Sequence, residues 1–189
     1  MKKIKLHLGC GDVYIPGFIH IDSAFYPHLD YQHDITDLLM FKDNSVDLIY
    51  CCHAFEYLDR KSGREALFEW FRVLNDGGIL RLAVPDFQSI VLVYEKYKDI
   101  DHRGILGPLF GKIETLLNGK MMYHKTAYDY KSLKKMLESA GFRSIRRWDW
   151  RKTEHSQYDD YSQAYIPHMD KEKGLLMSLN LEAEKINIV

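Results

Sequence analysis

Two features early in the chain have the residue types of a site that binds an organic cofactor. An apolar run at residues 4–8 ends in Gly9-Cys10-Gly11, and glycines at a strand end let a ligand approach free backbone amides closely. Asp22 ends the next apolar segment, where an acid can accept hydrogen bonds from both hydroxyls of a ribose. Glycine turns and strand-end aspartates also occur for structural reasons alone, so the surrounding elements must support a nucleoside site.

Two histidines are candidates for proton transfer, because histidine titrates near neutral pH. His53 follows an apolar run at residues 47–52, and His124 lies in the segment after the helix expected beyond Asp86. The alternative for each is a role in packing or in substrate contact. The histidines are otherwise dispersed and no C-x-x-C or H-x-x-x-H spacing occurs, so we predict no metal site.

The elements that must position these residues are strands alternating with helices. One helix is expected to begin with the capping box at Ser62 and to stop at Gly77-Gly78. A second is expected around residues 90–97, and a third runs from Leu133 to Ala140 with Gly141 after it. Strands are predicted at residues 4–8, 18–22, 29–33, 47–52, 79–84, 145–150 and 177–183. This alternation predicts an α/β fold with a largely parallel sheet and helices on its faces.

The first connections are too short for a normal parallel crossover. Only about six residues separate Gly11 from Phe18 and Asp22 from Leu29, whereas such a crossover takes about a dozen or more. We therefore expect the first two crossover helices to be shortened or absent and one flank of the sheet to be thinly covered. Exposed apolar surface on that flank would favour a homodimer.

The composition is that of a single globular domain, with 189 residues, 46% of them hydrophobic and 28% charged. The formal net charge of −1 gives no field that would attract nucleic acid or an anionic membrane. No run approaches the roughly 20 apolar residues of a membrane span, and no signal peptide is evident, so a cytoplasmic location is expected. Cys10, Cys51 and Cys52 are expected to be reduced thiols, the last two pointing to opposite faces of one strand.

An ordered set of motifs resembles the class I S-adenosylmethionine-dependent methyltransferases, and among them the small bacterial methyltransferase-type-11-like members. The resemblance spans nearly the whole chain and implies a Rossmann-like, mostly parallel sheet whose last strand is antiparallel. The motifs are L-x-L-G-C-G at residues 6–11, G-F-x-x-I-D at 17–22, D-x-x-x-L at 34–38, and similar segments at 46–59, 72–86 and 133–142. Relatives commonly read E-H-L after the fourth strand, where this chain has Glu56-Tyr57-Leu58.

The resemblance also implies a role for each motif in binding S-adenosylmethionine. The methionyl end would lie at the glycine turn, the ribose at Asp22 and Ser23, the adenine at Asp34 and Ile35, and the sulfonium near Cys52 and His53. For Asp34, capping of a helical turn at residues 35–39 is an equal alternative. The cofactor-binding residues implied in this way are Leu8, Gly9, Cys10, Gly11, Asp22, Ser23, Asp34, Ile35, Cys52 and His53.

We therefore expect methyl transfer to a small-molecule or glycan-precursor acceptor. The methyl is carried on a positively charged leaving group, so positioning supplies much of the acceleration. A base, His53 or His124, is needed only where the nucleophile starts protonated. One alternative is a binding module without catalysis. Another is a nicotinamide-dependent oxidoreductase, whose G-x-G-x-x-G fingerprint would require glycine at Tyr14.

The acceptor pocket is expected between a cover segment at residues 100–125 and a long loop at residues 151–176. An antiparallel last strand makes this loop start and finish at the carboxyl edge of the sheet, where ligands bind in open α/β sheets. Connections of this length are usually functional or disordered. The loop carries side chains that suit a polyhydroxylated acceptor, namely Tyr158, Asp159, Asp160 and Tyr161.

Overall fold

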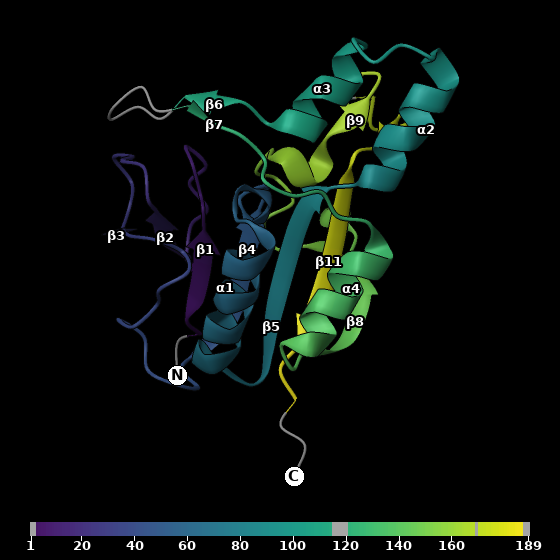
Figure 1. The fold of residues 1–189 in the computed structure, drawn as a ribbon. Coiled ribbons are helices and arrows are strands. Elements are labelled where there is room, and N and C mark those ends of the chain that lie inside the picture. Colours follow the sequence, from purple (N-terminus) through teal and green to yellow (C-terminus); the bar gives the residue numbers. More distant parts are fainter. Residues whose placement is uncertain (1–2, 115–120, 169, 187–189) are drawn as a thin grey trace.

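A seven-stranded sheet in the order β3-β2-β1-β4-β5-β11-β8 organises the molecule (Figure 1). The computed structural model describes residues 3–114, 121–168 and 170–186. All neighbouring strands pair in parallel except β11, which is antiparallel to β5 and β8. The predicted mostly parallel sheet with an antiparallel last strand is confirmed. Its strands are β1 (Lys5–Leu8), β2 (Ile19–Asp22), β3 (Tyr31–Gln32), β4 (Val46–Cys52), β5 (Leu74–Pro85), β8 (Arg143–Arg147) and β11 (Ser178–Glu184).

Helices and two small hairpins complete the described chain. Among the described residues no helix is long and apolar enough to cross a membrane. The helices are α1 (Arg60–Val73), α2 (Phe87–Tyr97), α3 (Arg103–Phe110) and α4 (Tyr130–Ser139), with single 3-10 turns η1 (Phe55–Tyr57), η2 (Trp150–Lys152) and η3 (Tyr161–Gln163). The hairpins are β6 (Ile113–Glu114) with β7 (Met121–Met122), and β9 (Tyr165–Ile166) with β10 (Leu175–Leu176).

The ends of α1 differ from the prediction. The helix is capped by Asp59, whose Oδ1 accepts the backbone N–H groups of Lys61 and Ser62, both at 2.9 Å. The predicted capping box at Ser62 is therefore wrong, because the earlier carboxylate already satisfies the free amides. The helix also stops before Gly77-Gly78, since Leu74 is extended and begins β5.

Other element boundaries shift by a few residues. The strand expected at 145–150 is β8, which ends at Arg147, and Trp150 begins η2 instead. In α2 the buried residues are Ser89, Ile90 and Val93, so the outer part of the expected apolar stripe faces solvent. Gly141 follows α4 with a φ of +104°, as predicted for a left-handed helix end.

The face of the sheet covered by α1 and α4 holds the main apolar core (Figure 1). Leu8, Ile49, Leu82 and Leu181 are fully buried there on four neighbouring strands. Trp70 from α1 is also fully buried in the same cluster. This core fixes the carboxyl ends of β1 and β4 beside each other.

The opposite face carries a row of polar and aromatic residues rather than helices. The crossovers from β1 to β2 and from β2 to β3 contain no helix, as the short spacings predicted. The chain after β8 covers this face, with the His155 ring centroid 4.2 Å from that of Tyr50. The expectation of a thinly covered flank is therefore wrong over these central strands. The row, read across the strands by register, is His20, His7, Tyr50, Arg81, Glu182 and Arg146.

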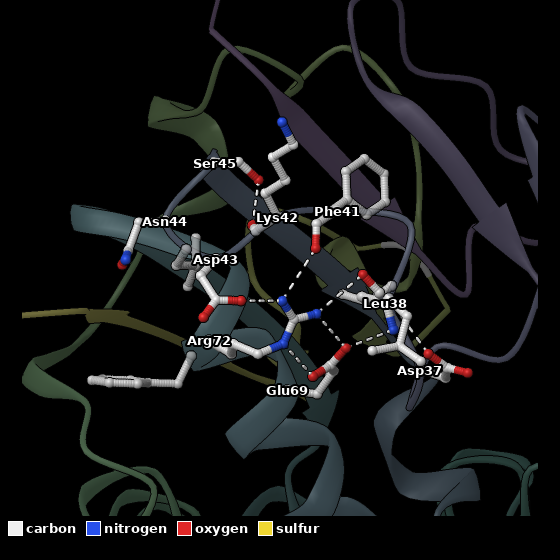
Figure 2. A network of polar contacts seen from close by, with 12 residues as sticks. Asp37, Leu38, Phe41, Lys42, Asp43, Asn44, Ser45, Glu69 and Arg72 are labelled. Carbon is white, nitrogen blue, oxygen red and sulfur yellow. Dashed lines mark hydrogen bonds and ion pairs between the residues drawn. The ribbon is translucent and has the colours of Figure 1, made fainter.

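The crossover from β3 to β4 also lacks a helix, and an arginine from α1 holds it in place (Figure 2). The Arg72 guanidinium donates to the Leu38 carbonyl at 3.2 Å and to Asp43 Oδ1 at 2.5 Å. Glu69 pairs with Arg72 at 2.7 Å and accepts the Leu38 N–H at 2.9 Å. Fork-like contacts of this kind fix a loop that has no helical hydrogen bonds of its own.

Candidate functional site

The glycine turn after β1 lies at the carboxyl edge of the sheet and is open beside Gly11. Gly9 and Gly11 have φ values of +62° and +55°, which favour glycine. A Cβ on Gly9 would lie 2.2 Å from the Cβ of Ala54, so the turn packs against the loop that follows β4. A Cβ on Gly11 would meet nothing within 4 Å, which leaves room for a ligand against the backbone. Leu8 and Cys10 flank the turn and are buried.

Asp22 closes the glycine turn and keeps capacity for a ligand. Its Oδ2 accepts the Gly11 N–H at 2.9 Å, and its Oδ1 accepts the Ala24 N–H at 2.8 Å. An ionised carboxylate has about four acceptor positions, so two remain for the two hydroxyls of a ribose. Ser23 lies exposed beside it. The half-buried carboxylate and the open glycine side therefore fit the nucleoside part of S-adenosylmethionine.

Asp34 and Ile35 follow β3 at the same edge. The N–H of the preceding His33 donates to the Asp22 carbonyl at 2.9 Å, which ties this segment to the end of β2. Asp34 Oδ1 accepts the N–H and the hydroxyl of Thr36, both at 2.8 Å, so the capping alternative has a direct contact. Residues 35–39 form turns rather than the expected helical turn. Ile35 is buried and presents an apolar side chain there.

Cys52 and His53 end β4 next to the glycine turn. Buried Cys51 and partly buried Cys52 pack in clusters on opposite faces of the sheet, as predicted. Burial raises the pKa of Cys10 to about 12 and raises those of the other two thiols well above their usual range. All three cysteines in the described chain are free and protonated, so none offers a thiolate nucleophile.

The two candidate histidines meet at a third residue, Glu56, to which the sequence had assigned no role. Glu56 Oε1 lies 3.4 Å from Nδ1 of His53 and 3.6 Å from Nε2 of His124. Glu56 is 1% exposed, and neither carboxyl oxygen has a hydrogen-bond partner among the described residues. We call these three residues the Glu56 cluster.

Neighbouring hydrogen bonds fix which imidazole nitrogens carry protons when both rings are neutral. Asn180 donates through Nδ2 to a backbone carbonyl, so its Oδ1 accepts the Ser178 hydroxyl proton at 2.8 Å. Ser178 Oγ must then accept from Nε2 of His53 at 2.9 Å, which leaves Nδ1 as a lone pair. His124 Nδ1 lies 3.0 Å from the Pro108 carbonyl and must donate to it, so its Nε2 is likewise a lone pair. Both lone pairs point at Glu56.

Burial sets the charge of the Glu56 cluster. Burial raises the pKa of Glu56 to about 8 and lowers that of His53 to about 3, with repulsion by His124 as a smaller cause. Burial also lowers the pKa of His124. The contacts therefore join a protonated carboxyl to neutral rings near pH 7, rather than forming ion pairs.

The described part of the cover segment lies beyond the carboxyl ends of the strands (Figure 1). It is attached through the Glu56 region, because Tyr57 Oη donates to the Gly111 carbonyl at 2.5 Å. The Lys125 N–H donates to the Glu56 carbonyl at 2.9 Å. Residues 115–120 of the expected cover lie outside the described residues.

The long loop starts and finishes at the carboxyl edge, but its expected acceptor residues divide into two groups. Asp160 Oδ2 accepts the Tyr50 hydroxyl at 2.5 Å, and Tyr158 packs against the cluster around Tyr50. Both residues therefore hold the loop to the sheet face. Tyr161 is 69% exposed, and its ring centroid lies 5.5 Å from that of His53. Asp159 is also exposed and pairs with Lys171 at 3.1 Å, so Tyr161 and Asp159 are the residues of this group that remain available to an acceptor.

In the part of the chain that the structure describes, no group of three His, Cys, Asp or Glu side chains is placed to hold a metal ion. The Glu56 cluster is included in that statement.

Comparison with known proteins agrees with this arrangement. The family model described as "Methyltransferase domain" matches residues 14–82, which include Asp22, the segment at 34–35 and the Glu56 turn. No curated protein sequence matches the chain.

Solved structures share the whole fold at low sequence identity. An S-adenosylmethionine-dependent methyltransferase from Archaeoglobus fulgidus has a TM-score of 0.59 at 16% identity, covering 97% of this chain and 86% of that one. One from Mesorhizobium loti has a TM-score of 0.53 at 16% identity, covering 97% and 91%. The 1,6-didemethyltoxoflavin-N1-methyltransferase of Burkholderia thailandensis, solved with S-adenosylhomocysteine, has a TM-score of 0.57 at 11% identity, covering 97% and 71%.

The fold is the Rossmann-like fold of these S-adenosylmethionine-dependent methyltransferases, and the methyltransferase-domain model matches residues 14–82 of the chain. The solved neighbours depend on S-adenosylmethionine or hold S-adenosylhomocysteine. The oxidoreductase alternative finds no support in the matched family.

Proposed function

We propose that this protein is an S-adenosylmethionine-dependent methyltransferase that methylates a small-molecule or glycan-precursor acceptor at the carboxyl edge of the sheet, above the glycine turn. The observation that carries this proposal is the open side of Gly11, with Asp22 and His53 on the flanking strands. These groups lie at the carboxyl edge of the sheet, where ligands bind in open α/β sheets. Bound there, S-adenosylmethionine would supply an electrophilic methyl group.

Each candidate cofactor residue has a contact that suits its proposed role. The glycine turn, with Leu8 and Cys10 buried behind it, would hold the methionyl end. Asp22 with Ser23 would bind the ribose, and Asp34 with the apolar Ile35 would bind the adenine. These assignments are our proposals for this chain.

The acceptor would bind between the cover segment and the part of the long loop at η3. Tyr161 supports this placement, because it is exposed and lies beside His53. An exposed aromatic ring offers a stacking surface for a sugar or another small ring. His53 and His124 are the proposed bases for an acceptor that starts protonated. We also propose a homodimer, supported by exposed Phe25, Tyr31 and Leu39 around the edge strand β3, to be tested by sedimentation.

Calorimetric binding to Asp22 variants tests the proposed cofactor site. We expect Asp22→Ala to weaken S-adenosylmethionine binding by about tenfold to a hundredfold, because hydrogen bonds to a charged group are worth about 1.5–3 kcal/mol. Asp22→Asn keeps the side-chain shape and should show a smaller loss. Glu65→Ala, on the exposed surface of α1, should bind as the wild type does. Unchanged affinity in Asp22→Ala, or a preference for NAD over S-adenosylmethionine in a thermal-shift assay, would overturn the proposal.

A further inference from the structure

We propose that Glu56, held between His53 and His124, accepts the proton that a hydroxyl acceptor loses. We also propose that the positive charge of the bound donor removes the proton from Glu56 before the methyl transfer. The inference rests on the proposed function, since it needs S-adenosylmethionine beside His53. It assigns a positioning role to Glu56, explains why two histidines contact this residue, and specifies a hydroxyl group as the acceptor.

Three proton-accepting atoms converge on one buried point. Glu56 Oε1, Nδ1 of His53 and Nε2 of His124 lie within 3.4–3.6 Å contacts. Three acceptors without a donor would repel one another, and a buried polar atom without a partner is costly. One proton shared by the cluster removes the conflict. The cluster is therefore built to hold a single proton that can leave and return.

Among the residues that the structure describes, no other group facing Glu56 supplies a positive charge that would hold its carboxyl group ionised. Burial raises the pKa of Cys51, Tyr57 and Tyr128, so these groups are neutral near pH 7. No lysine or arginine side chain forms an ion pair with Glu56 among the described residues. The groups facing the cluster among the described residues are Cys51 and Cys52 on β4, Tyr57 on η1, Tyr128 before α4, Tyr161 on η3 and the two histidines.

A cation bound next to His53 changes this balance. An opposite charge within about 4–6 Å favours the ionised form of a carboxyl group, so a sulfonium ligand would expel the proton from the cluster. The neutral product S-adenosylhomocysteine would let the proton return. The cluster is then basic while the donor is bound and protonated after the transfer.

The reaction balances with a hydroxyl acceptor. The methyl carbon–sulfur bond breaks with its electron pair going to sulfur, the carbon–oxygen bond forms, and the hydroxyl proton passes to the lone pair on Nδ1 of His53, which shares it with Glu56 Oε1. His53 is the member that an acceptor reaches, because its side chain is 12% exposed against 7% for His124 and 1% for Glu56. Glu56 acts through His53 and does not contact the acceptor.

Titration calorimetry in phosphate and in Tris at pH 7 tests the inference, because the two buffers differ in ionisation enthalpy and so report protons released on binding. We expect the wild type to release up to about one more proton with S-adenosylmethionine than with S-adenosylhomocysteine. In Glu56→Gln this difference should be smaller by that amount while both ligands still bind. Proton uptake by the ligand's own amino group cancels between the two proteins. The matched variant Glu65→Gln, an exposed acid on α1, should behave as the wild type.

An infrared difference spectrum of the wild type provides a second measurement that needs no variant. Addition of S-adenosylmethionine should remove the carbonyl band of a protonated carboxylic acid, and S-adenosylhomocysteine should leave it in place. Binding of both ligands with equal proton release, or an unchanged difference in Glu56→Gln, would overturn this inference alone. Failure of both ligands to bind would overturn the proposed function and this inference with it.

Discussion

Burial shifts the pKa values of two single residues, Glu56 and His7, in opposite directions. Burial raises the pKa of Glu56 to about 8 and lowers that of His7, in the polar row of the sheet, to about 3. The stability that Glu56 contributes is present below its ordinary value of 4.5 and is lost as the pH rises through 8. The contribution of His7 is present above 6.5 and is lost as the pH falls toward 3.

His7 provides a test of this linkage. Its ring stacks on that of Tyr50 at a centroid distance of 5.2 Å, and its Nδ1 has no partner among the described residues. His7→Phe keeps a stacked ring but cannot bind a proton. We expect the fall in unfolding free energy between pH 7 and pH 5 to be smaller in this variant by on the order of 1–2 kcal/mol, measured by urea unfolding. His168→Asn, at an exposed position, should keep the wild-type pH dependence. An equal pH dependence in His7→Phe would contradict the expected role of burial.

Sequence reasoning predicted the arrangement of residues that lie close together in the chain and missed contacts with distant partners. The glycine turn and Asp22 were predictable because strand, turn and acid follow one another closely in the chain. Glu56 was not, because its environment comes from His124 and from the burial of η1 in the folded molecule. Tyr158 and Asp160 were assigned to the acceptor from composition, yet Tyr50, which lies far from them in sequence, holds them to the sheet.

At the scale of elements, single side chains replace the missing crossover helices. The spacing of motifs correctly predicted that the first two crossovers lack helices. No sequence periodicity indicates which side chains hold a crossover without a helix in place, as in the segment between β3 and β4. Arg72 and Glu69 of α1 hold the chain between β3 and β4 (Figure 2). This segment follows Asp34 and Ile35, so α1 helps to position the proposed adenine side of the site.

Arg72→Lys should loosen that crossover. A lysine carries one point charge and cannot reproduce the forked contacts to Glu69, Asp43 and the Leu38 carbonyl. We expect a loss of about 1.5–3 kcal/mol in unfolding free energy, together with weaker S-adenosylmethionine binding. Denaturant unfolding and calorimetry would measure the two effects. Lys61→Ala, which removes an exposed pair on the same helix, should change stability by less than about 0.5 kcal/mol. Wild-type stability in Arg72→Lys would show that the crossover is held by packing alone.

At the scale of the whole molecule, one long connection completes the second layer. The chain after β8 runs across the polar face, where Glu154 pairs with Lys5 at 2.7 Å, and returns to the carboxyl edge at Tyr161. The sequence indicated a connection too long for a simple turn, and it was interpreted as an acceptor loop. The sequence did not indicate that this connection packs on the sheet, because its partners Tyr50 and Arg81 lie on distant strands.

Tyr50→Phe should show whether this connection belongs to the cooperative core. The Tyr50 hydroxyl is fully buried and donates to Asp160, so its removal leaves that carboxylate without one partner. We expect a loss of about 1–3 kcal/mol in unfolding free energy and faster tryptic cleavage after Arg151 and Lys152, which are exposed within the connection. Tyr161→Phe removes a hydroxyl from an exposed ring beside His53 and should leave both stability and cleavage unchanged. If Tyr50→Phe unfolds like the wild type while cleavage accelerates, the connection opens independently of the sheet and is a loop rather than a layer. Loss of stability together with faster cleavage instead makes residues 148–160 part of the fold, and confines acceptor contacts to the short stretch around Tyr161.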